Sequence, residues 1–278
     1  MPNQTHQAEL DIAVDAARRA GRLQMDHYER LERIVHKSEH DVVTEVDNLS
    51  EELIIGAVRA AFPGDAVLAE ESGRSSGVVV DATGTRHEGT PAVASPDERL
   101  WVVDPLDGTV NYANGIPVFC VSVALVIGGR PAVGVIYDPT RDELFSARAG
   151  DGAYLDGVPI RHPAKPKLLD AVVSLSLPTS RFALRERRIK KATRVSRNMG
   201  SASLALAYVS NGRFDAFIQG GGLSLWDIAA AGLIAEEGGA KVTAADGGPW
   251  FDLAMPAHRI GILAASVDHH PTLLGMLR

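Results

Sequence analysis

Two segments near the start of the chain carry apolar residues at helical spacing. Residues 10–28 place an apolar side chain at every third or fourth position, and residues 47–63 repeat that pattern before a Pro-Gly pair ends it. Runs of strand-forming residues then follow at 100–104, 119–127, 132–138 and 152–160. Gly128 and Gly129 lie where a tight hairpin turn is expected. The pattern predicts an α+β first lobe.

Strands and helices alternate after about residue 166. Expected strands span 171–177, 214–218 and 240–246, expected helices span 185–194 and 227–239, and a small-residue segment covers 199–212. This alternation is typical of an α/β lobe. We therefore expect an α+β lobe at residues 1–148 and an α/β lobe at residues 149–278. Residues 74–99, rich in Gly, Ser, Thr and Pro, predict a long surface excursion.

Composition excludes several classes of protein. The formal net charge of −7 argues against nucleic-acid binding, which needs a basic surface. The only cysteine, Cys120, lies in an apolar run and predicts a buried thiol, so a disulfide framework is not expected. The sequence offers no N-terminal apolar signal segment and no apolar run near the roughly 20 residues of a membrane span. We expect a cytoplasmic protein without a membrane partner.

Acidic residues follow a predicted strand in LWVVDPLDGTVNY, residues 100–112. Asp104 ends the strand, and Asp107 precedes Gly108 and Thr109, where a short helix is able to start. The stretch thus offers carboxylates for cations and backbone N–H groups for an anion. The plainer interpretation is a pair of turns, since Asp-Pro and Asp-Gly both favour turns. Either dipeptide alone fits that interpretation, whereas their combination favours a site.

Three more acidic positions have two interpretations each. Glu70, followed by a second glutamate, comes after a short apolar strand, and a solvated strand end is the plainer explanation. Asp227 begins a helix, where an N-cap worth about 1 kcal/mol is the plainer explanation. Thr44 and Asp47 fit a capping arrangement for the second helix.

These segments together resemble a known family. DPLDGTVNY at 104–112, AEES at 69–72, DVVTEVD at 41–47 and WDIAAAGLIAEEGG at 226–239 are similar to the signature segments of the inositol monophosphatase family, in the same order. That family consists of metal-dependent, lithium-sensitive phosphatases. The resemblance implies a layered αβαβα sandwich of the inositol monophosphatase and fructose-1,6-bisphosphatase type, and a homodimer.

The resemblance also implies a Mg²⁺ cluster of two or three ions, in which Mn²⁺ is able to substitute. Its ligands would be the side chains of Glu70, Asp104, Asp107 and Asp227 and the backbone carbonyl of Leu106. Carboxylates about 4 Å apart repel by roughly 4 kcal/mol at an effective dielectric constant near 20, so such a group needs cations. All-oxygen ligation suits Mg²⁺ rather than zinc, and none of the nine histidines lies in a zinc-ligand pattern.

The implied reaction is hydrolysis of a phosphate monoester by an activated water. Glu70 and one ion would activate the water, and Thr109 with Asp47 would orient it and accept its proton. The residues implied on the substrate side are Asp107, Gly108, Thr109, Gly200, Ser201, Ala202, Gln219 and Asp227. Small residues at 200–202 also fit close packing at a helix start. Lys37 is either a mobile lid over the site or a solvated loop lysine.

The substrate class rests on the same resemblance. Val110-Asn111-Tyr112 resembles the inositol-phosphatase branch, which favours inositol 1-phosphate or a related polyol or sugar phosphate. Histidinol phosphate and fructose 1,6-bisphosphate remain alternatives, and so does a non-catalytic regulatory member of the family. Gln219 stands where inositol-specific members usually carry a glutamate, and the glycines at 220–222 predict an irregular turn. The basic run at 185–194 predicts a solvated helix face rather than a nucleic-acid site.

Overall fold

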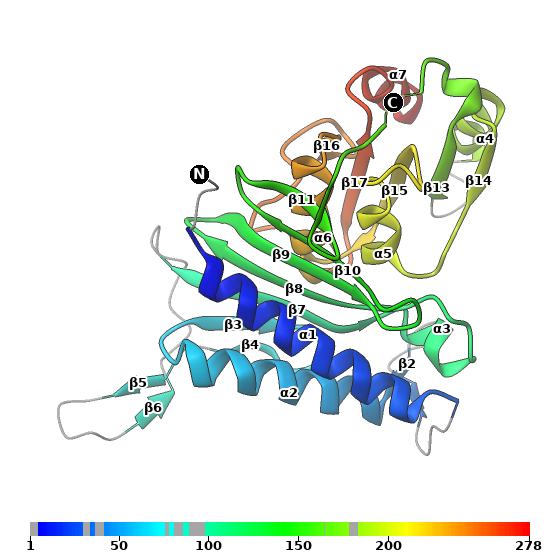
Figure 1. Cartoon of the computed structure of the whole chain (residues 1–278). Coiled ribbons are helices and arrows are strands. Elements are labelled where there is room, and N and C mark those ends of the chain that lie inside the picture. Colours follow the sequence, from blue (N-terminus) through cyan, green and yellow to red (C-terminus); the bar gives the residue numbers. More distant parts are fainter. Residues whose placement is uncertain are drawn as a thin grey trace.

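The computed structural model describes residues 5–29, 34–36, 42–75, 78–80, 86–88, 98–163, 165–177 and 183–278. Its largest element is an eight-stranded sheet (Figure 1). In spatial order the strands are β12 (Val158–Ile160), β11 (Gly152–Leu155), β10 (Glu143–Arg148), β9 (Arg130–Asp138), β8 (Cys120–Ile127), β7 (Arg99–Asp107), β3 (Ala66–Ala69) and β4 (Gly73–Ser75). Within this sheet β3 and β7 run parallel, whereas the other neighbouring strands are antiparallel.

Two long helices cover one face of this sheet. They are α1 (Gln7–His27) and α2 (Glu45–Ala61), the blue helices below the sheet in Figure 1. The sheet-facing side of α1 is a row of alanines, Ala13, Ala16, Ala17 and Ala20, all fully buried. Small side chains allow the helix to lie close to the strands, where Val133 and Val135 belong to the same apolar cluster.

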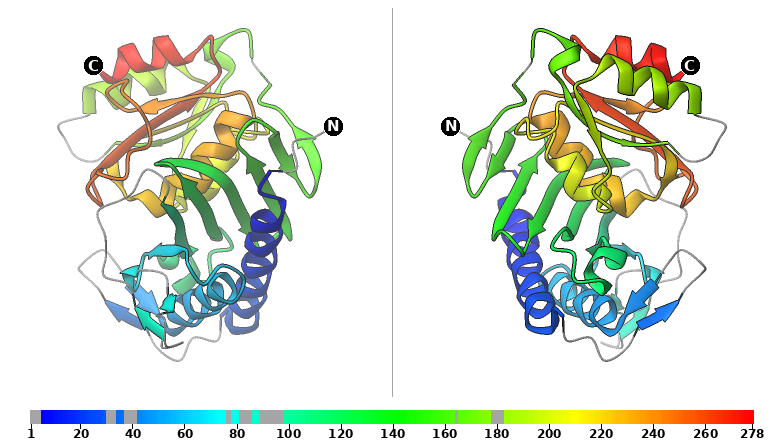
Figure 2. Two further views of the ribbon diagram at one scale, coloured as in Figure 1. Left: turned by 90° about the vertical axis from the view of Figure 1, so that its left-hand side faces the viewer. Right: turned by 90° about the vertical axis from the view of Figure 1, so that its right-hand side faces the viewer.

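A second sheet of five strands forms another layer. Its order is β14 (Val195–Arg197), β13 (Val172–Ser176), β15 (Ala216–Leu223), β17 (Ile260–Ala265) and β16 (Lys241–Ala244). The helices α5 (Ala202–Ala207) and α6 (Leu225–Glu237) lie between the two sheets (Figure 2). Because α6 contacts a sheet on each side, it is apolar almost all round, and Ile228 and Ile234 are both fully buried.

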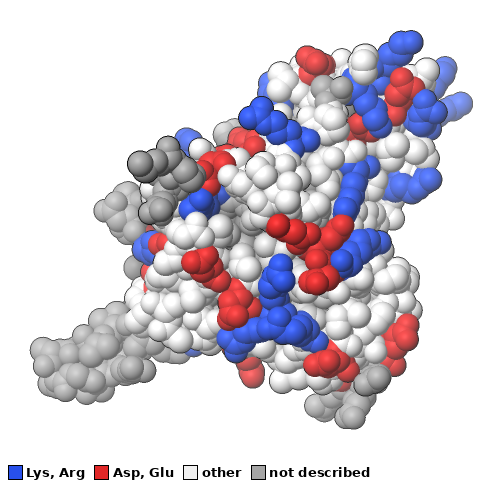
Figure 3. Space-filling model, in the orientation of Figure 1, with Lys and Arg blue, Asp and Glu red and all other residues white. Residues whose placement is uncertain are grey.

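The outer face of the second sheet carries α4 (Ala183–Ala192) and α7 (His270–Leu277). Ile189 and Leu273, one from each helix, pack on the sheet in a third apolar cluster. Most basic side chains of α4 are exposed and contribute to the blue groups at the upper right of Figure 3. The predicted solvated face of this helix is confirmed.

Short elements complete the fold. They are the pair β1 (Ile34–His36) and β2 (Val42–Thr44), the pair β5 (Val78–Val80) and β6 (Arg86–Glu88), α3 (Thr109–Ala113) and a 3₁₀ turn at Leu168–Asp170. The β5–β6 pair projects from the main body in Figure 1, within the predicted excursion. In the described part of the chain, no helix is both long and apolar enough to cross a membrane.

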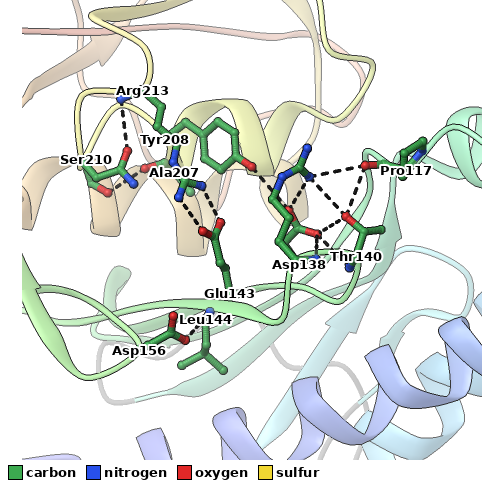
Figure 4. Close-up of polar contacts among 12 residues, drawn as sticks. Pro117, Asp138, Thr140, Glu143, Leu144, Asp156, Ala207, Tyr208, Ser210 and Arg213 are labelled. Carbon is green, nitrogen blue, oxygen red and sulfur yellow. Dashed lines mark hydrogen bonds and ion pairs between the residues drawn. The ribbon is translucent and has the colours of Figure 1, made fainter.

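Polar contacts tie α5 and the turn after it to the first sheet (Figure 4). Asp138, fully buried at the end of β9, accepts hydrogen bonds from the N–H and hydroxyl groups of Thr140 and from the Tyr208 hydroxyl at 3.4 Å. Arg213 forms an ion pair with Glu143 on β10, and its guanidinium lies 4.7 Å from the centroid of the Tyr208 ring. These contacts fix the position of α5 relative to the first sheet.

The layered αβαβα sandwich is therefore confirmed. The first helix begins three residues earlier than expected, at Gln7, and the second begins two residues earlier, at Glu45. The expected turn at residues 220–222 is wrong, because these glycines lie inside β15, but the expected irregularity is present, since the register with β17 shifts between Gln219 and Leu223. Membership of the first sheet ends at Ile160, and the division into lobes between residues 148 and 149 stays a prediction.

Candidate active site

Two carboxylates lie side by side because β3 and β7 are parallel. Ala69 is the register partner of Val103, and the N–H of Glu70 donates to the Val103 carbonyl oxygen at 3.2 Å. The next residues, Glu70 and Asp104, therefore lie side by side where β3 ends, while β7 continues to Asp107. The carboxyl ends of parallel strands are a common place for ligand sites.

A β-bulge turns Asp107 to the same side as Asp104. Residues three apart on a regular strand face opposite sides of the sheet. Here Asp104 pairs with Ser122 while Asp107 pairs with Cys120, so three steps on β7 match two steps on β8. The extra residue restores the common face. The Leu106 N–H also donates to Asp104 Oδ1 at 3.0 Å, which holds the bulge in place.

Asp227 reaches the same place from α6. Ser224 is the N-cap residue of this helix, and its N–H donates to Asp227 Oδ2 at 2.6 Å. The interpretation of Asp227 as the N-cap residue is therefore wrong. Asp227 lies three residues after the N-cap and is the N3 residue of a capping box. The helix cap thus orients a carboxylate toward the sheet.

The three aspartates form one cluster. One carboxylate oxygen from each of Asp104, Asp107 and Asp227 lies within 4.8 Å of the others. Burial raises the pKa of Asp104 well above its usual value, and the charges of Glu70, Asp107 and Asp227 raise it further. Burial also raises the pKa of Asp107, although hydrogen bonds from the Ser201 hydroxyl and from backbone N–H groups oppose that shift.

Asp107 is held by hydrogen bonds from residues at the start of α5. Its Oδ2 accepts hydrogen bonds from the Ser201 hydroxyl at 2.5 Å and from the Ser203 N–H at 2.8 Å, and Oδ1 accepts from the Ala202 N–H at 3.3 Å. The Cys120 thiol lies 3.7 Å from Oδ2 and 3.8 Å from the Ser201 hydroxyl oxygen. The predicted buried thiol is confirmed, and the Ser201 hydroxyl is directed to Asp107.

Thr109 and Asp47 also meet as the sequence predicted. The Thr109 Oγ1 lies 3.1 Å from Asp47 Oδ1 and 3.0 Å from the Leu106 carbonyl oxygen. Asp47 Oδ2 accepts hydrogen bonds from the N–H and the hydroxyl of Thr44 at 2.8 and 2.6 Å, which closes the capping box of α2. Asp47 therefore caps a helix and contacts the candidate site at the same time.

Two glycines permit this close approach. Gly108 has φ 101°, and a Cβ there would lie 2.9 Å from the Val118 carbonyl oxygen. Gly200 has φ 77°, and a Cβ there would lie 2.8 Å from the Asn111 amide. Both positions need a positive φ and leave no space for a side chain, which explains why glycine occurs at each.

Gln219 is half-buried on β15, and its amide donates to the Gly221 carbonyl oxygen at 3.3 Å. Lys37 lies outside the described residues, so both interpretations of it stay predictions.

Gln24 is a further residue of the site, which the sequence patterns did not single out. It is fully buried on α1, and its amide donates a hydrogen bond to the Pro105 carbonyl oxygen at 2.7 Å, inside the bulge. A polar residue within the apolar stripe of the helix was the available signal.

Comparison with known proteins agrees with this geometry. The model of the inositol monophosphatase family matches residues 6–277. "Nus factor SuhB" of Pasteurella multocida is 38% identical over 86% of both chains, and "Inositol monophosphatase 1" of Solanum lycopersicum is 37% identical over 83% of this chain and 82% of its own.

Solved structures show the same architecture. The "extragenic suppressor protein suhB" of Bartonella henselae superimposes with a TM-score of 0.82 at 30% identity, covering 98% of this chain and 99% of the other. The inositol monophosphatase of Anabaena superimposes with a TM-score of 0.79 at 34% identity, covering 98% and 95%. The chain belongs to the inositol monophosphatase family.

Proposed function

We propose that this protein is a Mg²⁺-dependent phosphatase that hydrolyses a small phosphate monoester, with inositol 1-phosphate or a related polyol or sugar phosphate as substrate. The observation that carries the proposal is the meeting of Asp104, Asp107 and Asp227 within 4.8 Å, next to the Thr109–Asp47 pair. Family membership supports phosphatase chemistry. A 35% identical relative from Mesorhizobium japonicum carries the name inositol-1-monophosphatase.

The donor set fits Mg²⁺. Three buried or half-buried carboxylates converge, Glu70 lies beside Asp104, and the Leu106 carbonyl borders the group, so every donor is an oxygen. The raised pKa of Asp104 reflects repulsion that a cation would relieve. Bound there, Mg²⁺ would lower the pKa of a coordinated water and stabilise charge on the leaving oxygen. Mn²⁺ prefers the same donors.

The residues of the chain supply orientation and proton transfer. The Thr109 hydroxyl would accept a proton from the attacking water and pass its own proton to Asp47 Oδ1, which lies 3.1 Å away. Glu70 would hold the same water at the end of β3. The N–H groups of Gly108 and Thr109 stand at the start of α3 and would contact the phosphate oxygens.

Residues at the start of α5 and on β15 would recognise the alcohol part of the ester. Ser201 and Ala202 donate hydrogen bonds to Asp107, and with Gly200 before them they would border the leaving group. Gln219 offers one acceptor and one donor group where a glutamate would offer two acceptor oxygens. We therefore expect inositol 1-phosphate to be hydrolysed alongside fructose 1,6-bisphosphate and histidinol phosphate at comparable efficiency.

A non-catalytic regulatory role is the alternative. Relatives named "Nus factor SuhB" are 36–38% identical to this chain, and that name favours a role beyond hydrolysis. A non-catalytic member of a metal-dependent family is expected to lack metal-binding side chains. Here Asp104, Asp107 and Asp227 are all present and converge. The geometry therefore supports a working phosphatase. The cytoplasmic location stays a prediction from composition, and the homodimer stays a prediction from the family resemblance.

The function is tested by phosphate release from the three esters, with Mg²⁺ and with EDTA. Wild type is expected to be active only with Mg²⁺ and to be inhibited by Li⁺. Asp227→Asn should lose activity but remain folded, because the asparagine oxygen still accepts the Ser224 N–H that Asp227 accepts at 2.6 Å. Activity that survives EDTA, or a fully active Asp227→Asn enzyme, would overturn the proposal.

Stability without metal should depend on the charge of Asp104. Its raised pKa means that the folded state binds a proton more tightly than the unfolded state, so this contribution to stability is present at low pH and is lost as pH rises through the raised pKa. With EDTA at about pH 8, Asp104→Asn should therefore raise Tm, by about 2–4 °C for each kcal/mol gained. At about pH 5 the gain should be smaller. An unchanged or lower Tm at both values, by calorimetry, would contradict this electrostatic account.

Thr109→Ala should lower kcat by roughly 10²- to 10⁴-fold, the contribution typical of a general acid–base group, with little change in KM. Thr109→Ser keeps the hydroxyl and is the matched control, expected to retain most of the activity. Steady-state kinetics at saturating Mg²⁺ give both parameters. If the alanine variant loses only thermal stability while kcat is unchanged, Thr109 is a structural residue.

Gln219→Glu should shift substrate preference toward inositol 1-phosphate. A glutamate is unable to donate to the Gly221 carbonyl oxygen and presents two acceptor oxygens to neighbouring hydroxyls. The ratio of kcat/KM for inositol 1-phosphate to that for fructose 1,6-bisphosphate should rise by about tenfold, as for one added charged hydrogen bond. Strong wild-type selectivity that the substitution leaves unchanged would show that Gln219 does not contact the substrate.

A further inference from the structure

Glu51 is a buried glutamate on α2, one helical turn after Asp47. Glu51 is only 4% exposed. Oε2 accepts a hydrogen bond from the Glu71 N–H and Oε1 accepts one from the Ser72 N–H, each at 2.9 Å. Both carboxylate oxygens therefore bind consecutive N–H groups of one turn, which follows directly after Glu70.

This turn connects β3 to β4. The two strands are antiparallel, with Ala69 paired to Gly73, so residues 70–72 form a tight connection. The first residue of the turn is bound to β7, because the Glu70 N–H donates to the Val103 carbonyl oxygen. The next two residues are bound to α2, because their N–H groups donate to Glu51. The backbone of Glu70 is thus fixed between a strand and a helix.

The two hydrogen bonds explain why a carboxylate occupies this buried position. Glutamate is seldom buried to this degree without partners, since desolvation of its charge is costly. A glutamine would be neutral, but it has only one acceptor oxygen for the two N–H groups. A carboxylate supplies a separate acceptor oxygen to each of the two backbone donors.

We propose that Glu51 is a positioning residue that holds the 70–72 turn so that the Glu70 carboxylate stays beside Asp104. This proposal rests on the proposed function, because it assigns Glu70 to the metal site. Asp47 and Glu51 then make α2 the element that aligns two parts of the site. Asp47 orients Thr109 through its side chain, and Glu51 orients Glu70 through the backbone.

The test compares Glu51→Gln with Glu52→Gln. The second variant removes the same charge from the adjacent, exposed position of the same helix. Glu51→Gln should lower kcat for inositol 1-phosphate by about tenfold or more and raise the Mg²⁺ concentration for half-maximal activity several-fold, as disturbed supporting residues of metal sites do. The KM for the ester should stay within about twofold. Glu52→Gln should match wild type in all three quantities.

A second readout does not depend on activity. Saturating Mg²⁺ raises the Tm of a protein that binds it only when folded. That rise should be smaller for Glu51→Gln than for wild type and Glu52→Gln at the same Mg²⁺ concentration. If wild type hydrolyses no ester but this difference is found, the proposed function fails while the role of Glu51 stands. If Glu51→Gln lowers only the metal-free Tm, and both kcat and the Mg²⁺ response are unchanged, Glu51 is structural and the proposal is overturned.

A double-mutant cycle tests whether Glu51 acts through Glu70. The loss of Mg²⁺ response caused by Glu51→Gln should largely disappear when Glu70→Gln is already present, because the residue being positioned has lost its function. Additive effects would overturn the proposal. Glu51→Asp keeps the charge but shortens the side chain by one CH₂ group. It provides the same comparisons if Glu51→Gln does not fold, and a normal Mg²⁺ response in it would count against the proposal.

Discussion

The repulsion among carboxylates at the end of β7 is the constraint on which the rest of the structure depends. Oxygens of Asp104, Asp107 and Asp227 lie within 4.8 Å of one another, and the first two residues are buried. Without a cation, the charges of such a group repel one another and raise the pKa of Asp104, and the group keeps its geometry only if its backbone is held in place. The two apolar layers around α6 and the bulge in β7 fix that backbone. The large buried core therefore offsets a local electrostatic cost.

Capping and site formation are one arrangement in this protein. Asp47 and Asp227 are both N3 residues of capping boxes, bonded to Thr44 and Ser224. A capping box fixes the side-chain torsions of its acidic residue, because the carboxylate bonds to the N-cap backbone. The capping box thereby fixes the direction of the carboxylate, and no further side-chain entropy is lost when that carboxylate also takes part in the site. Helix starts are thus suitable places for groups that must be held rigidly, and the choice between cap and ligand is not exclusive.

The sequence predicts the layers and the acidic positions but not the contacts that hold them. Asp104 and Glu70 are recognisable because strand ends and acidic residues are local signals. The local preference of Gly220–Gly222 is a turn, whereas β15 continues through them as an irregular stretch, because pairing with β17, distant in sequence, resumes at Leu223. The hydrogen bond from Ser201 to Asp107 joins residues 94 positions apart, so no local pattern reports it.

The candidate site is built from both faces of the first sheet. The helices α1 and α2 approach from one face and contribute Gln24, Asp47 and Glu51. From the other face, α5 and α6 bring the N–H groups that hold Asp107 and the carboxylate of Asp227. The end of β7 lies between them, so the separation of the carboxylates depends on how three layers pack. A cation held by Asp104, Asp107 and Asp227 would join β7 to α6, and its binding energy would become folding energy. Metal affinity and stability would then be set by the same contacts.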